Sequence, residues 1–197
     1  IARPGSTHQE SWGGAFADGL RRHGWSVEVS QRAKPADLLV LWGVRNSAAI
    51  DMQKRHGGEI CILERGYLGD RFKWSSVSFG GKLNNRAEFR GVSSDPSRFS
   101  ANFGHLMQPW RRQVGYALLI GQVPGDMSLA AVGGKLDRWY ADTAPELQSL
   151  GYEVRFREHP EAVKRGYRAP RLDGVATMHG DLASAIGAAE LVVSFNS

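Results

Sequence analysis

The sequence predicts an α/β protein with two lobes, each built on a parallel sheet with helices on its faces. Three observations support this: short apolar runs, stretches of helical spacing between them, and a restart of that alternation halfway along the chain. Strands buried on both faces are typical of parallel sheets, and strands that alternate with helices indicate βαβ units. We place the lobes at residues 1–112 and 113–197, with a cleft between them where small molecules commonly bind.

The first half contains a regular succession of expected elements up to residue 63. Helical spacing before Gly24 predicts a helix, and alternating or continuous apolar stretches predict the strands. In order, we expect a helix from about 11 to 23, strands at 25–29 and 37–43, a helix at 48–55 and a strand at 59–63.

The pattern is lost from residue 65 to residue 108, which we expect to be a long irregular basic region. Long loops in compact domains are usually functional. Here basic side chains can neutralise phosphates while aromatic rings stack on an exposed base, although aromatic rings that fill the space under a loop explain the composition equally well. The candidate acceptor or nucleic-acid contacts are Arg65, Arg71, Lys73, Trp74 and Arg86.

The second half restarts the alternation at a fully apolar run. We expect strands at 116–120, 152–157 and 191–195, helices at about 134–149 and 182–189, and a further helix that Asp126 or Ser128 caps. The chain stops directly after the last of these strands, so we expect the C-terminal lobe to be incomplete at residue 197.

Composition narrows the class of protein. The net charge of +5 and the pI of about 9.6 suit a polyanionic partner such as double-stranded DNA, and they also serve solubility. No apolar run approaches the roughly 20 residues that span a bilayer. The single cysteine, Cys61, lies in an apolar run, and one cysteine cannot form an internal disulfide. The six histidines do not have the spacing that is typical of metal ligands. We expect a cytoplasmic protein without a metal; the oligomeric state is not indicated.

Polar residues gather where the strands of the second half end. In an open parallel sheet these loops meet at one edge, where ligands bind, and their donors suit phosphate and ribose oxygens. Ordinary turns, with glycine permitting the bend and Pro160 holding His159, explain each loop taken alone. The candidate donor-binding residues are Gly121, Gln122, Asp126, Ser128, Arg157, His159, Ser194, Asn196 and Ser197.

Taken together and in this order, these motifs resemble the donor-binding half of GT-B glycosyltransferases, in particular the capsule-polysaccharide transferases. The resemblance covers residues 114–197. It implies two Rossmann-like lobes, no obligatory metal, and a nucleotide-sugar donor, with a UDP-sugar favoured and a CMP-sugar as the alternative. By position, Gln122, Asp126 and Ser128 would line the donor pocket, Arg157 and His159 would face the phosphates, and 194–197 would contact phosphate or sugar. The chain ends before the acidic residue that often follows the last motif.

Sugar transfer with inversion requires a group that removes a proton from the acceptor hydroxyl. Asp70 and Glu64 are the candidates, with His8 behind them, and an ion pair with a neighbouring arginine is the alternative role for each carboxylate. The basic first lobe favours hydroxymethylated bases in DNA, as in phage DNA modification, as the acceptor. The alternatives are a surface or capsular glycan, or a protein that binds nucleotides or nucleic acid without catalysis.

Overall fold

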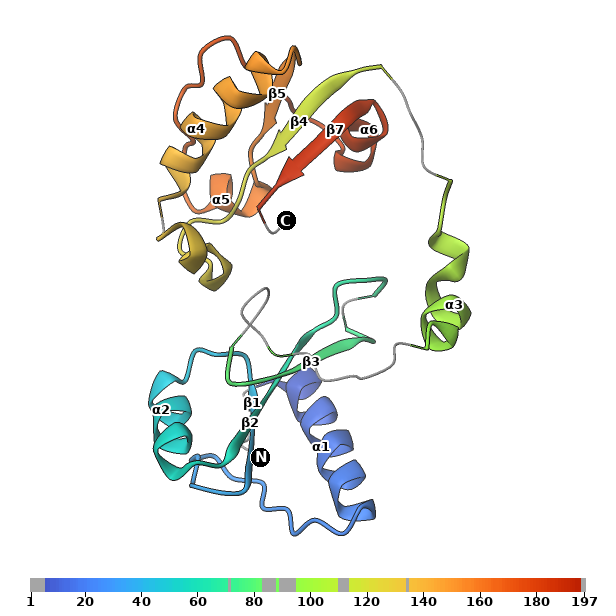
Figure 1. Ribbon diagram of the computed structural model, residues 1–197, viewed down its shortest axis with the longest axis vertical. Coiled ribbons are helices and arrows are strands. Elements are labelled where there is room, and N and C mark those ends of the chain that lie inside the picture. Colours follow the sequence, from blue (N-terminus) through green and yellow to red (C-terminus); the bar gives the residue numbers. More distant parts are fainter. Residues whose placement is uncertain are drawn as a thin grey trace. The chain divides into compact units, whose positions relative to one another are not determined.

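The computed structural model shows a mixed α/β protein and describes residues 6–70, 72–82, 88, 95–109, 114–133 and 135–195. The chain divides into two units, Ile1–Gln108 and Pro109–Ser197. Each unit has its own sheet, which contains parallel strands and carries helices on both faces (Figure 1). The expected α/β class is therefore confirmed.

Unit 1, residues 1–108, is built on a three-stranded sheet in the order β1-β2-β3. Strands β1 and β2 are parallel, whereas β3 runs antiparallel to β2. Ser6 caps the first helix by accepting the N–H of Gln9. The elements are α1 (Thr7–Arg22), β1 (Leu38–Trp42), α2 (Ser47–His56), β2 (Glu59–Arg65), β3 (Ser75–Phe79), α3 (Ser97–Phe103) and the 3-10 helix η2 (Gly104–Leu106).

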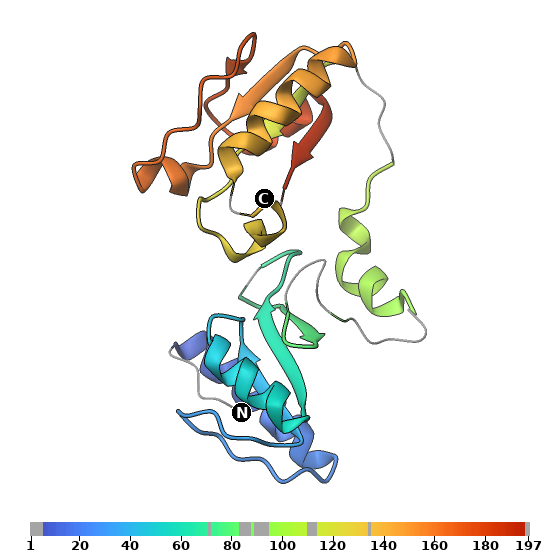
Figure 2. The ribbon, with the colours of Figure 1, turned by 60° about the vertical axis from the view of Figure 1, so that its left-hand side comes forward.

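The sheet of unit 1 is covered on both faces because alternate residues of β1 and β2 point to opposite sides. On one face, Leu39, Leu41, Ile60 and Ile62 pack with Ile50 of α2. The other face holds Val40, Cys61 and Leu63, with Phe16 of α1 against them. Figures 1 and 2 show α1 and α2 on opposite sides of this sheet.

Two expectations for unit 1 are wrong. Residues 25–29 form no strand, and Trp25 and Val29 remain 44% and 46% exposed, because neither face of this stretch is buried against the sheet. The third strand is instead Ser75–Phe79, inside the region expected to be irregular, and it is antiparallel. This region also contains α3, and its short serine-rich strand has the composition of a loop.

Unit 2, residues 109–197, is built on a four-stranded parallel sheet in the order β6-β5-β4-β7. The three strands expected here are confirmed within two residues at each end. The segment after the first turn is a 3-10 helix rather than an α-helix. The elements are β4 (Tyr116–Ile120), η3 (Met127–Val132), α4 (Leu136–Ser149), β5 (Val154–Arg157), α5 (Pro160–Lys164), β6 (Ala176–Thr177), α6 (Leu182–Gly187) and β7 (Ala189–Ser194).

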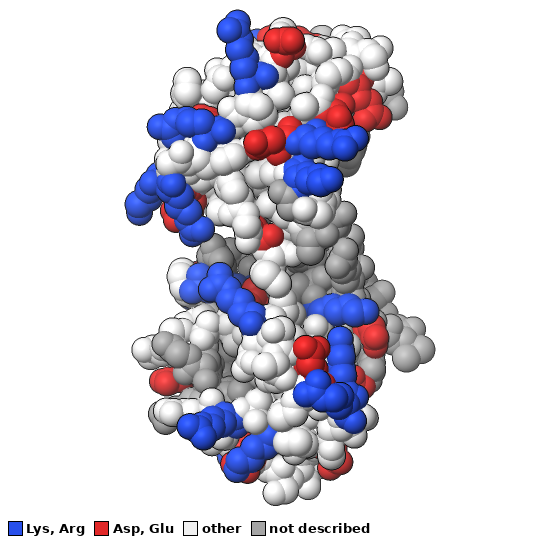
Figure 3. Space-filling model, turned by 90° about the vertical axis from the view of Figure 1, so that its left-hand side faces the viewer, with Lys and Arg blue, Asp and Glu red and all other residues white. Residues whose placement is uncertain are grey.

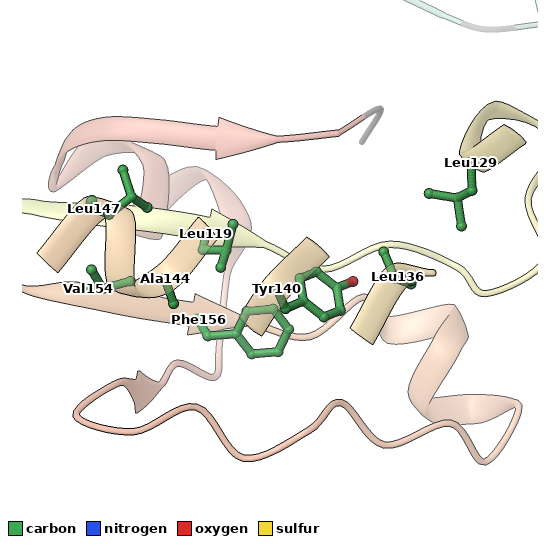
Figure 4. Packing of buried hydrophobic residues seen from close by; sticks show 9 residues of the cluster. Leu119, Leu129, Leu136, Tyr140, Ala144, Leu147, Val154 and Phe156 are labelled. Atoms are coloured by element: carbon green, nitrogen blue, oxygen red, sulfur yellow. The ribbon is translucent and has the colours of Figure 1, made fainter. Parts of the chain in front are cut away.

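The centre of unit 2 is β4, all of whose residues are buried. Leu119 and the neighbouring Phe156 pack in one cluster with the buried residues of α4, where the ring of Tyr140 contacts that of Phe156 (Figure 4). Leu118 faces the other way, toward Ala185 of α6. Burying each large apolar side chain contributes about 1.5–3 kcal/mol. This packing holds the carboxyl ends of β5, β4 and β7 at one edge of the sheet.

Candidate functional site

The carboxyl ends of three parallel strands lie side by side in unit 2. Ile120, which ends β4, pairs in register with Arg157 of β5 on one side and with Ser194 of β7 on the other. The three polar loops therefore leave the sheet from neighbouring positions, as the sequence predicted. Asn196 and Ser197 lie outside the described residues. We call this region the donor edge and define it by residues 121–128, 157–159, 180–181 and 194.

Gly121 brings the first two loops of the donor edge into direct contact. Its N–H donates to the carbonyl oxygen of Arg157 over 2.7 Å. A Cβ at this position would lie 2.9 Å from the nitrogen of His159, 3.0 Å from the oxygen of Arg157 and 3.1 Å from the Cα of Glu158. All three are backbone atoms, so only glycine fits here.

Gln122 is anchored in the interior. It is only 4% exposed, and its N–H donates to the hydroxyl oxygen of Tyr140 over 2.6 Å. Tyr140 is itself fully buried, and this burial is the main cause that raises the pKa of its hydroxyl to about 12. The phenol therefore stays neutral at physiological pH, and the backbone of Gln122 is fixed to α4.

Asp126 and Ser128 shape the next turn. The carboxylate of Asp126 accepts the N–H of Ser128 over 2.8 Å and so opens the 3-10 helix η3. The Oγ of Ser128 is buried and has no hydrogen-bond partner among the described residues. A buried hydroxyl without a partner is costly, so this oxygen is suited to meet a polar group of a ligand.

Arg157 extends from the end of β5 toward the loop before α6. Its Nη2 donates to the carbonyl oxygen of Gly180 over 2.6 Å, while its Nε is buried without a partner in the part of the chain that the structure describes. Asp181 lies nearby and caps α6 by accepting the N–H and the hydroxyl of Ser184. These hydrogen bonds are the main cause that lowers the pKa of Asp181, and the charge of Arg157 adds to it.

His159 is held in one orientation. Its Nδ1 accepts the N–H of Glu161 over 3.1 Å, which leaves the proton of the neutral imidazole on Nε2. Partial burial is the main cause that lowers its pKa, and the charge of Arg157 acts in the same direction, against Glu161 and Asp126. At neutral pH the ring is therefore an uncharged Nε2–H donor.

The donor edge can therefore offer three kinds of donor to an anion: a guanidinium, a hydroxyl and a neutral imidazole. Such groups at the carboxyl edge of a parallel sheet suit phosphate oxygens. Ser194 lies at the same edge and is exposed.

A second cluster lies at the carboxyl end of β1 in unit 1, around His8. The imidazole makes edge-to-face contacts with Trp42, whose ring centroid is 5.4 Å away, and with Phe72, at 5.3 Å. Its Nε2 is buried, and no described residue offers it a hydrogen bond. The guanidinium of Arg65 lies 4.7 Å from the centre of the Phe72 ring, on which it stacks. We call His8, Trp42, Arg65 and Phe72 the imidazole cluster.

The two carboxylate candidates have different surroundings. Glu64 extends over the backbone of Gly43, with its Oε1 3.0 Å from the point that a Cβ of Gly43 would occupy. Asp70 accepts the N–H of Phe72 over 2.9 Å, and its second oxygen lies 4.0 Å from the Nζ of Lys73. Asp70 therefore stabilises its own exposed turn, and Lys73 is the cationic side chain that lies near it among the described residues.

Trp74 has a packing role in unit 1. Its ring lies 4.7 Å from that of Phe103 in α3, the guanidinium of Arg98 stands over it, and its carbonyl accepts the N–H of Gly66. The alternative in which this aromatic ring fills space under a loop is therefore favoured over base stacking. Lys73 is 80% exposed and extends into solvent. Arg71 and Arg86 lie outside the described residues.

Neither the distribution of charged side chains nor the surface hollows single out one functional site. On the face shown in Figure 3, Lys and Arg side chains are interspersed with Asp and Glu in each unit. A hollow of about 530 Å³ lies under the 168–175 loop of unit 2, and its wall includes Glu158, next to Arg157. Another, of about 270 Å³, lies in unit 1 between the end of α1 and residues 25–36.

Comparison with known proteins gives no family. Neither a family model nor the sequence of a curated protein matches the chain. Within the described ranges, His, Cys, Asp and Glu do not gather in groups of three that could hold a metal ion. None of the helices in those ranges combines the length and hydrophobicity needed to cross a bilayer.

Sequence reasoning missed Tyr140 and Asp181. Tyr140 occupies an apolar position of α4 at helical spacing from Leu136 and Ala144, so it cannot be distinguished from a core residue. Asp181 had a signal, since an aspartate directly before the first residues of a predicted helix is typical of an N-cap.

Proposed function

We propose that the chain is a glycosyltransferase of the GT-B type that moves a sugar from a nucleotide-sugar to an acceptor hydroxyl. One observation carries the proposal. At the donor edge, the buried Nε of Arg157 and Oγ of Ser128 have no partners within the described ranges, and His159 of the same edge is a neutral donor. Unit 2 would bind the nucleotide-sugar, with a UDP-sugar as the favoured donor, and unit 1 would present the acceptor.

The donor edge would act on the leaving group. As the bond between the anomeric carbon and the phosphate oxygen breaks, negative charge grows on the phosphate. Donors already held in place stabilise such charge without reorganisation. Arg157 supplies the positive charge, and its Nη2 is already fixed on Gly180. His159, oriented by Glu161, supplies a hydrogen bond without needing to be charged.

On the acceptor side, His8 is the best-supported base of the three candidates. In the step, the acceptor oxygen bonds to the anomeric carbon while its proton passes to the base. The Nε2 of His8 lacks a partner within the described ranges and can accept this proton. Asp70 accepts the N–H of Phe72, and the carboxylate of Glu64 lies close to Gly43.

A hydroxymethylated base in double-stranded DNA is the acceptor that we favour. The net charge of +5 suits a polyanion. Tyr67, on the loop after β2, is 66% exposed and could stack on a base flipped out of the duplex. If DNA is bound through several phosphates, its affinity should fall steeply as salt rises. A flat salt dependence, with transfer to a capsular glycan, would favour the glycan acceptor instead.

The donor site is tested by calorimetric titration with UDP, GDP, CMP and ADP. Arg157→Gln removes the guanidinium, and Arg155→Gln is the matched control, because Arg155 lies on the same face of β5 but pairs with Glu153. We expect Arg157→Gln to weaken binding by about tenfold or more, since hydrogen bonds to charged groups contribute about 1.5–3 kcal/mol. The control should bind like the wild type. An unchanged affinity in Arg157→Gln would contradict the proposed donor site.

Catalysis is tested separately from binding. His8→Gln should abolish sugar transfer to DNA that contains hydroxymethylated cytosine and leave the UDP affinity unchanged, whereas Asp70→Asn should retain transfer. Loss of transfer only in Asp70→Asn would make that carboxylate the base. Nucleotide binding by the wild type without any turnover would identify a binding protein, the alternative class.

A further inference from the structure

Tyr140 connects α4 to the donor edge across the core of unit 2. Its hydroxyl oxygen accepts the N–H of Gln122, the second residue after β4, over 2.6 Å. The ring is fully buried and packs edge-on against Phe156 of β5, with the ring centroids 4.9 Å apart. Figure 4 shows the hydroxyl of Tyr140 pointing toward the chain that leaves β4. The ring therefore has little freedom to move, and neither has the hydroxyl.

Two successive peptides at the end of β4 are thereby fixed to different elements. The N–H of Gly121 donates to the carbonyl oxygen of Arg157, which joins the turn to β5. The N–H of Gln122 donates to Tyr140, which joins the same turn to α4. With both peptide planes fixed, the direction in which the chain leaves the sheet toward Asp126 and Ser128 is also set.

We propose that Tyr140 is a positioning residue for the donor edge, whose hydroxyl orients the Gln122 peptide and so places the turn 121–128 beside Arg157 and His159. This inference rests on the proposed function, because it assigns Tyr140 to the site that would bind the nucleotide. Without the hydroxyl, the buried N–H of Gln122 has to find another acceptor or remain unpaired, which is costly. The turn would shift, and the ligand would meet Ser128 and Arg157 in a looser arrangement.

Tyr140→Phe tests this because it keeps the ring and removes only the hydroxyl. Tyr116→Phe is the matched control. The hydroxyl of Tyr116 also makes a buried hydrogen bond, to the carbonyl oxygen of Ala185 over 2.8 Å, but Tyr116 begins β4 at the opposite edge of the sheet. Two quantities are measured in the full chain: the affinity for UDP by calorimetry, and the hydrogen exchange rate of the Gln122 amide by NMR.

We expect Tyr140→Phe to weaken UDP binding by about threefold to tenfold, the range that one net hydrogen bond produces. The Gln122 amide should also exchange about threefold to tenfold faster, which corresponds to a hydrogen bond of the usual net strength. In Tyr116→Phe both quantities should match the wild type.

Equal loss of affinity in the two variants, or an unchanged Gln122 exchange rate in Tyr140→Phe, would overturn the role of Tyr140. If the wild type binds no UDP or other nucleotide, the proposed function fails, and Tyr140 has no donor to position. The exchange rates then still show whether the hydroxyl anchors Gln122, so the two failures can be told apart.

Discussion

Replacing Gly121 by alanine tests how the donor edge is built. The new Cβ would lie 2.9–3.1 Å from three backbone atoms of residues 157–159, where carbon normally keeps about 3.5–4.0 Å. Because those atoms belong to the backbone, the turn has to move away from β5, which strains the hydrogen bond between Gly121 and Arg157. Overpacking of this kind costs about 1–3 kcal/mol, and we expect a loss of that size in the stability of unit 2.

The loss is measured by hydrogen exchange of the β4 amides as urea is raised, since these amides report the opening of unit 2 alone. Gly187→Ala is the control, because a Cβ at Gly187 in α6 meets nothing within 4 Å. The control should be neutral or slightly stabilising. A Gly121→Ala protein within about 0.5 kcal/mol of the wild type, a change typical of surface substitutions, would refute the close contact between these loops.

Three further predictions concern side chains in both units. The pKa of His159 is lower in the folded protein than in the unfolded chain, so the unfolded chain takes up a proton first as the pH drops. The free energy of unfolding should therefore fall as the pH drops below about 6.5 and become constant below the pKa of the folded state. His159→Asn should remove this component from urea titrations run between pH 8 and pH 5. Burial raises the pKa of the Cys61 thiol to about 12, so this thiol should react with a disulfide reagent only after unit 1 unfolds. Fast reaction in the native protein would contradict the burial of Cys61. Gln53 is fully buried and bonds both backbone groups of Ala36, so Gln53→Ala should destabilise unit 1 by about 1–3 kcal/mol in urea, and an unchanged midpoint would count against these bonds.

Three of the four strands of unit 2 were predictable because they are apolar or alternating runs separated by clear stop signals, whereas β6 is only two exposed residues long and has no such pattern. The run at 116–120 is buried on both faces, and a parallel central strand requires that pattern. Unit 1 was less predictable for the same physical reason. Residues 25–29 alternate like a strand but do not pair with the sheet. Ser75–Phe79 is polar and forms a strand only because it pairs with the free edge of β2.

The neighbouring ends of β4, β5 and β7 could also be predicted, because strand order and direction alone bring them together. How deeply each side chain is buried could not be predicted. Gln122 is predicted to line the donor pocket, and no local pattern shows that it is buried or that its backbone is fixed to Tyr140. The hydrogen bond of Asp70 to its own turn could not be predicted either, and the surroundings of His8 depend on a ring from β1 and another from the loop after β2. Such contacts join residues far apart in the chain and leave no local pattern.

The central claim is that the donor edge of unit 2 binds the phosphates of a nucleotide. It is tested most directly by titrating UDP into the ¹⁵N-labelled chain and following the backbone amides by NMR. We predict that the largest shifts fall on residues 121–128, 157–159 and 180–181, together with Ser194. Shifts confined to unit 1 or to the far edge of the sheet, or no saturable shift with any of the four nucleotides, would contradict the claim.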